Sequence, residues 1–214
     1  MKVLVTGSSQ GIGLAIAQLF LDNGHEVIGF DIQNCPINNP NYTHYNIDIR
    51  DELPEIADVD ILVNNAGTQD SDKAIAVNLV ATMNVTEKYG VREGIKSIVF
   101  ITSASSRNGA EFPEYVASKG GVVSYMKNVA TRIARYNATC NGISAGGVIT
   151  PLNKHILESE ELYSQVLAET LLNKWAKPEE IAELAYFLTV VNSSITGEDI
   201  LIDNGEMLKA NFIW

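Results

Sequence analysis

A tyrosine and a lysine one helical turn apart are the residues of this sequence with the clearest capacity for chemistry. Tyr115 and Lys119 lie within residues 112–135, which are predicted to be helical, so both side chains share one helix face. A free phenol has a pKa of ~10, and a neighbouring cation favours its charged form. The pair is therefore a candidate general acid/base, although a tyrosine and a lysine at this spacing also occur by chance in many helices.

A glycine-rich turn near the start of the chain is a candidate phosphate site. Residues 2–6 form a predicted strand, Gly7, Gly11 and Gly13 follow it, and an apolar helix runs to about Asn23. In such a unit the free N–H groups and the dipole at the helix start favour a bound pyrophosphate. A three-glycine turn alone is a weak signal for a dinucleotide.

Two carboxylates follow neighbouring predicted strands and are candidates for the adenosine side of such a site. Asp31 ends the strand 26–31, where a carboxylate can accept hydrogen bonds from ribose hydroxyls. The alternative for Asp31 is an ordinary solvated acid at a strand end. Asp48 follows the strand 42–47 and could lie beside the adenine.

The elements that must position these residues alternate between strands and helices. The predicted strands are 2–6, 26–31, 42–47, 60–63, 97–102, 138–143 and 198–202. After the first helix, the predicted helices are 51–57, 72–89, 112–135, 150–175 and 178–190. This alternation predicts an α/β fold in three layers, with a doubly wound, Rossmann-like parallel sheet. We expect residues 1–214 to form one domain.

Composition excludes several classes of protein. The chain has 214 residues, 46% of them hydrophobic and 19% charged, as in compact globular proteins. Its net charge of −11 disfavours nucleic acids and anionic membranes as partners. The 2 cysteines have no zinc-site spacing, and we expect neither a disulfide nor a metal. No signal peptide or apolar run of ~20 residues is evident, so we expect a soluble cytoplasmic protein.

Taken in order, the motifs resemble those of the short-chain dehydrogenase/reductase family. The matching motifs are Thr6-Gly7-x-x-x-Gly11-x-Gly13, Asn64-Asn65-Ala66-Gly67, Asn78, Ser103 and Tyr115-x-x-x-Lys119. The resemblance extends from Met1 to about Gly205 and implies the strand order 3-2-1-4-5-6-7. It also implies hydride transfer between a nicotinamide cofactor and an alcohol/carbonyl pair.

The resemblance assigns a catalytic role to four residues. Tyr115 resembles the general acid/base, and Ser103 resembles the hydroxyl that holds the substrate oxygen. Lys119 resembles the residue that binds the nicotinamide ribose and tunes the tyrosine. Asn78 resembles the residue whose helix distortion seats a proton-relay water.

The resemblance also assigns the cofactor-binding residues, which fall into three groups. The first group, at the pyrophosphate, is Gly7, Ser9, Gln10, Gly11, Ile12 and Gly13. The second group, at the adenosine, is Asp31, Ile32, Asp48, Ile49, Asn65, Ala66 and Gly67. The third group, at the nicotinamide and its ribose, is Tyr115, Lys119, Gly146, Val148 and Thr150.

The residues around Asp31 favour NAD(H) over NADP(H). A carboxylate there repels the additional phosphate of NADP, and the neighbouring positions Gln10, Ile32 and Gln33 supply no cation to offset that repulsion. Two rival interpretations remain open. One is an NADPH-dependent oxoacyl reductase, and the other is a non-catalytic dinucleotide-binding sensor.

Several features depart from the family's pattern or fall outside its motifs. Ala145 replaces the usual proline, which predicts a softer following loop, and Asn204 replaces a glycine. The segments 67–78 and 103–115 are shortened, which trims the wall of the substrate pocket. Arg107 could meet an acidic substrate, but a solvated loop arginine is the simpler interpretation. The three histidines belong to no recognisable triad.

Two further expectations concern a lid and the assembly. Residues 150–176 are expected to form a short substrate lid, or simply to pack on the sheet, through the apolar side chains of Leu152, Ile156, Leu162, Tyr163, Val166, Leu167 and Trp175. The resemblance implies a homodimer or homotetramer. The apolar tail 210–214 suits burial at a subunit contact.

Overall fold

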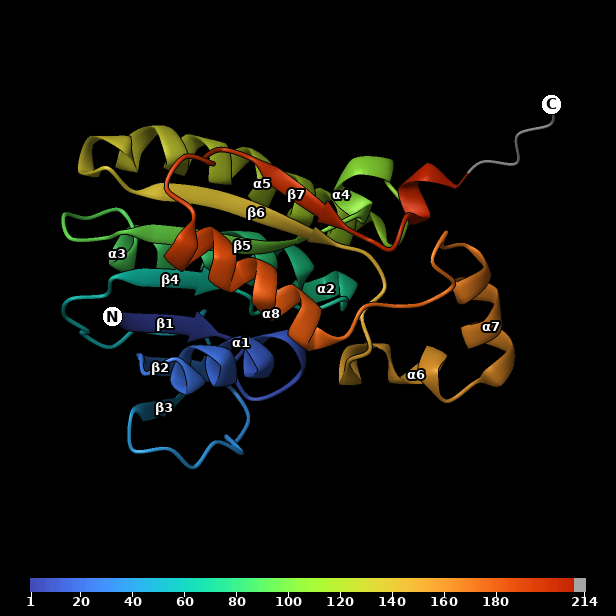
Figure 1. Cartoon of the computed structure of the whole chain (residues 1–214), viewed down its shortest axis with the longest axis horizontal. Coiled ribbons are helices and arrows are strands. Elements are labelled where there is room, and N and C mark those ends of the chain that lie inside the picture. Colours follow the sequence, from blue (N-terminus) through green and yellow to red (C-terminus); the bar gives the residue numbers. More distant parts are fainter. Residues whose placement is uncertain (210–214) are drawn as a thin grey trace.

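The fold is a parallel sheet with helices on both faces. The computed structural model describes residues 1–209 and orders the strands β3-β2-β1-β4-β5-β6-β7 (Figure 1). The strands are β1 Lys2–Thr6, β2 Glu26–Asp31, β3 Tyr42–Asn46, β4 Ile61–Asn64, β5 Ser97–Ser103, β6 Thr139–Ala145 and β7 Asp199–Ile202. Every neighbouring pair is parallel. The predicted fold class and strand order are confirmed.

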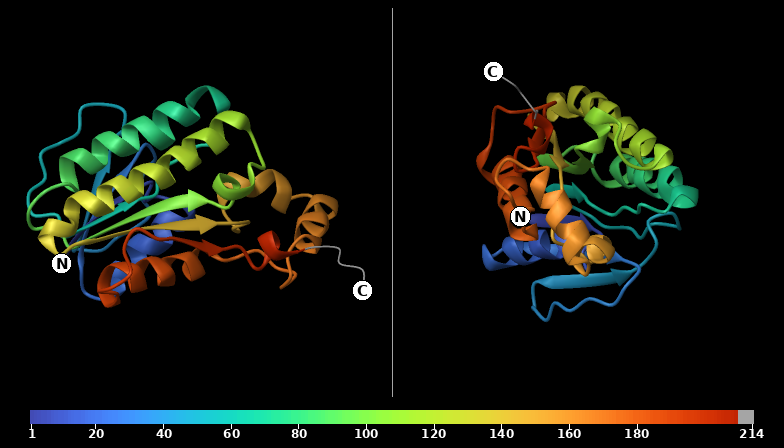
Figure 2. Two further views of the ribbon diagram at one scale, coloured as in Figure 1. Left: turned by 90° about the horizontal axis from the view of Figure 1, so that it is seen from above. Right: turned by 90° about the vertical axis from the view of Figure 1, so that its right-hand side faces the viewer.

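Alternation of side chains along the strands divides the core between the two faces of the sheet. Leu4, Leu62 and Phe100 point to the face covered by α3 (Thr82–Tyr89) and α5 (Pro113–Ile133). Val3 and Val63 point to the opposite face, covered by α1 (Gly11–Asp22) and α8 (Pro178–Tyr186). Figure 2 shows these three layers edge-on. The period of two in each strand therefore builds two apolar layers with one buried sheet between them.

The helix that carries Tyr115 and Lys119 is set by its own sequence. Pro113 occupies the first turn of α5, where its missing N–H has no intrahelical partner to lose. The buried residues Tyr115, Lys119, Val122, Met126, Val129 and Ile133 recur with helical spacing and face the sheet. The hydrophobic packing of the later residues therefore fixes the rotation of the helix, and that rotation aims Tyr115 and Lys119 inward.

The predicted helix 72–89 is present but contains a π-helical segment. It is built from α2 (Ser71–Ala74), the π-helix η1 (Ile75–Ala81) and α3, which follow one another directly. Asn78 lies at the centre of η1 and is buried. Such π-helical segments are rare and often occur at functional sites.

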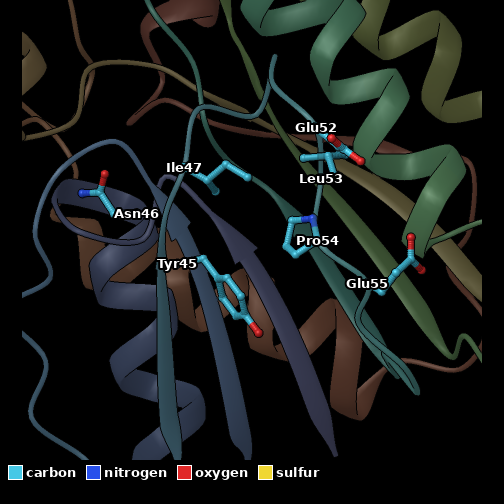
Figure 3. A pocket seen from close by; sticks show the side chains of 7 residues that line it. All are labelled: Tyr45, Asn46, Ile47, Glu52, Leu53, Pro54 and Glu55. Atoms are coloured by element: carbon cyan, nitrogen blue, oxygen red, sulfur yellow. The ribbon is translucent and has the colours of Figure 1, made fainter.

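The predicted helix 51–57 is wrong, because residues 51–60 contain no helical turn. Pro54 lacks an N–H and disfavours a helical conformation at the residue before it. The segment is tied instead to α3, since Lys88 donates to the Leu53 carbonyl at 2.7 Å and Tyr89 donates to the Pro54 carbonyl at 2.6 Å. It leaves a hollow of about 360 Å³ beside β3, lined by Tyr45, Asn46, Ile47, Glu52, Leu53, Pro54 and Glu55 (Figure 3).

The predicted helix 150–175 is broken into short pieces. They are the single turn η3 (Pro151–Asn153), α6 (Lys154–Leu157) and α7 (Glu160–Ala168), and they lie beyond the carboxyl ends of the strands (Figure 1). Ser159 caps α7 by accepting a hydrogen bond from the Leu162 N–H, which separates α7 from α6.

The remaining predictions differ from the structure in small ways. The short helix α4 (Ser105–Asn108) was not predicted, and the predicted helix 178–190 ends in a π-helical turn, Phe187–Val191. Cys35 and Cys140 are free thiols, as expected. Among residues 1–209, none of the helices has the length and apolar character to cross a bilayer. The tail 210–214, expected at a subunit contact, lies outside the described residues.

Candidate active site

The residues predicted to do chemistry come together at the carboxyl end of the sheet. Ser103 is the last residue of β5, Tyr115 lies in the first turn of α5, and Lys119 follows one turn later. The Lys119 Nζ atom is 5.8 Å from the centre of the Tyr115 ring and donates to the Ile101 carbonyl at 2.9 Å. The hydroxyl of Ser103 is near enough to Tyr115 to favour the charged form of its phenol. The three side chains are buried.

Burial dominates the titration of this pair. It raises the pKa of Tyr115 to about 12, and Glu111 adds to the rise, while the nearby hydroxyl of Ser103 opposes it. Burial also lowers the pKa of Lys119 to about 8, against the opposing effect of Glu111. Desolvation is the largest influence on the pKa of Tyr115 in the protein without cofactor. Tyr115 is therefore a neutral phenol at neutral pH.

Asn78 fastens the loop after β4 to α5. Its amide nitrogen donates to the Thr68 carbonyl at 2.9 Å and to the Ser118 hydroxyl at 3.0 Å, and its oxygen accepts from the Thr68 N–H at 2.8 Å. Ser118 in turn donates to the Tyr115 carbonyl at 2.7 Å. The side chain of Asn78 is thus occupied by hydrogen bonds to Thr68 and Ser118.

The turn between β1 and α1 has the close packing that a phosphate-binding turn requires. A Cβ on Gly13 would lie 2.0 Å from the Gly7 carbonyl oxygen, so only glycine lets the helix approach the strand this closely. Gly7 has a φ of +68°, which is also typical of glycine. Asn65 braces the turn by donating to the carbonyls of Thr6 and Gly7, each at 3.0 Å.

The side chain of Asp31 faces this turn. Its carboxylate accepts hydrogen bonds from the N–H groups of Ser9 and Gln33, each at 2.9 Å, and the residue is 8% exposed. It is therefore neither a free nor a solvated acid. Asp31 and the glycine turn, predicted as parts of one cofactor site, are in direct contact.

Asp48 and Ile49 lie beyond the end of β3. Arg50 donates to both Asp48 oxygens, at 2.6 to 3.1 Å, and holds the pKa of that carboxyl below its usual range. Ile49 is buried in the core on the side of α3 and α5, whereas Ile32 is 66% exposed. One member of the predicted adenosine group, Asp48, is thus already paired with the neighbouring Arg50.

The loop after β6 brings the predicted nicotinamide residues toward the glycine turn. A Cβ on Gly11 would lie 3.2 Å from the Thr150 methyl group, so the two regions touch. Val148 pairs with Ala176, and a Cβ on Gly147 would overlap the Trp175 indole. The loop therefore packs against the segment that leads from α7 to α8.

Ala145, which stands where the family's pattern has a proline, is the last residue of β6. Ala145 pairs with Ser103 of β5 and with Ile202 of β7, and its carbonyl accepts from the Ala104 N–H at 2.8 Å. Gly146 continues the pairing by donating to the Ile202 carbonyl at 3.0 Å. Because alanine keeps backbone pairing on both sides, β6 extends to the edge of the loop.

Three residues near Tyr115 were missed by the sequence analysis. Glu111 precedes α5 with a φ of +87°, and its pKa is raised by desolvation and by the Glu206 carboxylate, while Gln69 opposes the rise. A Cβ on Gly146 would lie 3.2 Å from an oxygen of Glu206. Glu111 lies four residues before Tyr115 and ahead of the start of α5, and this proximity in the chain could have indicated it. Gln69 and Glu206 belong to no motif of the sequence.

The weaker candidates have structural partners. Arg107 pairs with Asp199 of β7 at 3.0 Å, so it is not a free cation facing a substrate. His25 lies 3.4 Å from the Tyr186 hydroxyl, and His44 bonds to the Gln33 carbonyl at 2.9 Å. Both histidines lie outside the group formed by Ser103 and Tyr115, as expected from the lack of a triad.

Comparison with known proteins places this geometry among oxidoreductases. The family model described as enoyl-(acyl carrier protein) reductase matches residues 52–206. A short chain dehydrogenase, ausX, of Penicillium brasilianum is 33% identical to the chain and aligns with 94% of each protein.

Two solved structures with cofactors have the same fold. The structure titled 4-hydroxyisoleucine dehydrogenase complexed with NADH has a TM-score of 0.86 and 26% identity, over 98% of this chain and 99% of the other. A structure described as a 2-deoxy-D-gluconate 3-dehydrogenase of Agrobacterium tumefaciens with bound NADP has a TM-score of 0.87 and 26% identity, over 97% and 96%.

Proposed function

The chain belongs to the short-chain dehydrogenase/reductase family of NAD(P)-dependent oxidoreductases, and we propose that it transfers a hydride between NAD(H) and an alcohol/carbonyl substrate. The observation that carries the proposal is the burial of Ser103 and Tyr115 beside Lys119, at the carboxyl end of the sheet. In open α/β sheets this end is where ligands bind.

In this proposal the residues of the chain handle the proton while the cofactor supplies the hydride chemistry. During reduction, the hydroxyl of Ser103 donates a hydrogen bond to the carbonyl oxygen and holds it near Tyr115. Tyr115 gives its proton to that oxygen as the carbon receives the hydride, and Lys119 stabilises the resulting phenolate. Oxidation reverses each transfer.

The glycine turn, Asp31 and the loop after β6 would hold the dinucleotide. The fit rests on the close approach of Gly13 to Gly7 and on the contact between Gly11 and Thr150. Asp31 would accept hydrogen bonds from the adenosine ribose, which favours NAD(H). The NADP-bound relative shows that this fold also accommodates the phosphate, so the preference rests on Asp31 itself.

The proposal is tested by a screen of alcohols and ketones with both cofactors, following the absorbance of the reduced nicotinamide. Turnover that prefers NAD(H) supports it. Turnover only with NADPH and oxoacyl thioesters would instead favour the oxoacyl reductase, an alternative suggested by the description of the matching family model. Cofactor binding without turnover would favour the other alternative, a non-catalytic dinucleotide-binding sensor.

The same site predicts how stability depends on pH. The pKa of Lys119 is about 8 in the folded protein, below its ordinary value of 10.5, so between these values the unfolded chain binds more protons than the folded one. The free energy of unfolding therefore rises with pH across this window because of Lys119, by up to ~3 kcal/mol. Denaturant unfolding of the apoprotein at pH 7.5 and pH 10 measures the rise. Lys119→Met should remove this part of the rise, and an unchanged pH dependence in the variant would contradict the assignment.

We further propose that the chain assembles as a homodimer or homotetramer through the helix that contains Asn78. Ile75, Val80 and Met83 on this helix are 40%, 49% and 36% exposed, and apolar side chains gathered on one surface favour a contact. Val80→Asp should shift the oligomer toward monomer in light scattering, with Lys127→Glu on α5 as the control for an added negative charge. A wild-type protein that is monomeric at micromolar concentration would contradict this proposal.

We also propose that residues 150–176 form the substrate lid. Trp175 is buried and meets the edge of Tyr163 with ring centres 5.9 Å apart, which anchors the segment. Leu152 and Leu162 are 48% and 44% exposed beyond the ends of the strands, and they are the candidates for substrate contact. Leu162→Ser should raise KM for the substrate with little change in the Kd of NADH.

A further inference from the structure

A buried carboxylate connects three strands with the segment that follows Ser103. Asp199 begins β7, and its side chain is 8% exposed. It accepts from the hydroxyl of Thr102 on β5 at 2.8 Å and lies 2.7 Å from the hydroxyl of Ser144 on β6. A Cβ on Gly142 would lie 2.7 Å from a carboxylate oxygen, so glycine at this position makes room for Asp199.

Arg107 is the counter-charge of this carboxylate. It lies in α4, and its Nε and Nη2 atoms approach one Asp199 oxygen at 3.1 and 3.0 Å, while Nη2 also contacts the Asp199 carbonyl. The guanidinium is planar and stays charged at any pH the protein experiences. The side chain therefore ties α4 to β7 in one orientation.

The position of α4 matters because its first residue holds the hydroxyl of Ser103. The N–H of Ser105 lies 3.2 Å from the Ser103 Oγ atom, and the Ser105 hydroxyl donates to the same atom at 2.8 Å. The Ser144 hydroxyl, within reach of Asp199, also lies 3.1 Å from the Ser103 carbonyl. Two hydrogen-bonded routes thus lead from Asp199 to Ser103, one through Arg107 and α4 and one through the strands.

We propose that Arg107, held by Asp199, is a positioning residue that fixes the hydroxyl of Ser103 through α4. This inference rests on the proposed function, in which Ser103 holds the substrate oxygen. Without Arg107, α4 loses its attachment to β7, and Ser105 no longer holds the Ser103 hydroxyl in the direction of Tyr115. Misplacement of a substrate-holding group by about 1 Å is enough to lower a rate ~100-fold.

A double-mutant cycle separates this role from simple stabilisation. Arg107→Ala should lower kcat by about 10- to 100-fold while changing the Kd of NADH less than twofold. In the Ser103→Ala background the same substitution should lower kcat no further, because Arg107 acts through Ser103. The matched control is Arg132→Ala, which breaks the comparable arginine–carboxylate pair with Glu87, at 2.6 Å, on α3 and α5. It should leave kcat unchanged.

Two results would overturn the proposal. One is an unchanged kcat in Arg107→Ala, and the other is an equal loss of kcat in the wild-type and Ser103→Ala backgrounds. A readout that needs no substrate is the exchange of amide hydrogens in residues 104–109, which should become faster in Arg107→Ala and stay unchanged in Arg132→Ala. Unaltered exchange would contradict the proposed attachment of α4 to β7 through Arg107. Absence of turnover in the wild-type protein, with faster exchange in Arg107→Ala, would instead contradict only the proposed function.

Discussion

Replacing Tyr115 with phenylalanine lowers kcat by ~10²–10⁴-fold, the usual contribution of a positioned general acid/base. The variant keeps the buried ring and loses only the hydroxyl. The Kd of NADH, measured by calorimetry, should change little, because the proposed cofactor contacts lie mainly in the glycine turn and at Asp31.

The control is Tyr125→Phe, which removes a hydroxyl from the same helix at a surface hydrogen bond with Glu87. That substitution should leave both kcat and the Kd of NADH unchanged. Lys119→Ala, in contrast, should impair binding and turnover together, since Lys119 is proposed to serve the ribose and the phenol. Most of the wild-type kcat remaining in Tyr115→Phe would disprove the proposed acid/base.

We expect NAD(H) to bind about 30- to 1,000-fold more tightly than NADP(H), a difference of roughly 2–4 kcal/mol. Asp31 is fixed by the N–H groups of Ser9 and Gln33, so it cannot turn away from an additional phosphate without losing both hydrogen bonds. Arg50, which follows the predicted adenosine residues Asp48 and Ile49 in the chain, is paired with Asp48. Calorimetric titration with both reduced cofactors measures the ratio.

Asp31→Ala should narrow this preference mainly by weakening NAD(H), because the ribose hydroxyls lose their acceptor. Asp48→Asn is the control, and it should leave the ratio of the two dissociation constants almost unchanged. Equal or tighter binding of NADPH by the wild-type protein would refute the proposed preference, and it would point to a lysine or arginine from elsewhere in the fold.

Local patterns in the sequence, together with the family resemblance, were sufficient to predict the sheet and much of the candidate site. The strand order followed from the family resemblance, and the burial of β1, β4 and β5 followed from their apolar runs. Tyr115 and Lys119 share a buried helix face because their spacing matches the period of the helix. The proximity of Asp31 to the glycine turn was likewise predicted from chain order.

The features that were missed depend on contacts between residues distant in the chain. Residues 51–57 have a helix-like composition, but Pro54 and the hydrogen bonds from Lys88 and Tyr89 hold them in an irregular conformation. Arg107 was interpreted as a solvated loop residue because its partner lies on β7. The pKa of Tyr115 is raised mainly by burial of the phenol. The spacing between a tyrosine and a lysine in the sequence does not show how deeply the phenol is buried.

Direct hydride transfer is tested most directly with NADH that carries deuterium at the nicotinamide C4 position. A carbonyl compound identified by the substrate screen is reduced by the wild-type protein and by Tyr115→Phe, and the product alcohol is analysed by mass spectrometry. We expect deuterium on the carbinol carbon of the alcohol formed by the wild-type protein. With Tyr115→Phe we expect the rate of labelling to be ~10²–10⁴-fold lower. Alcohol formed without deuterium from C4-labelled cofactor of either stereochemistry, or labelled equally fast by Tyr115→Phe, would contradict it.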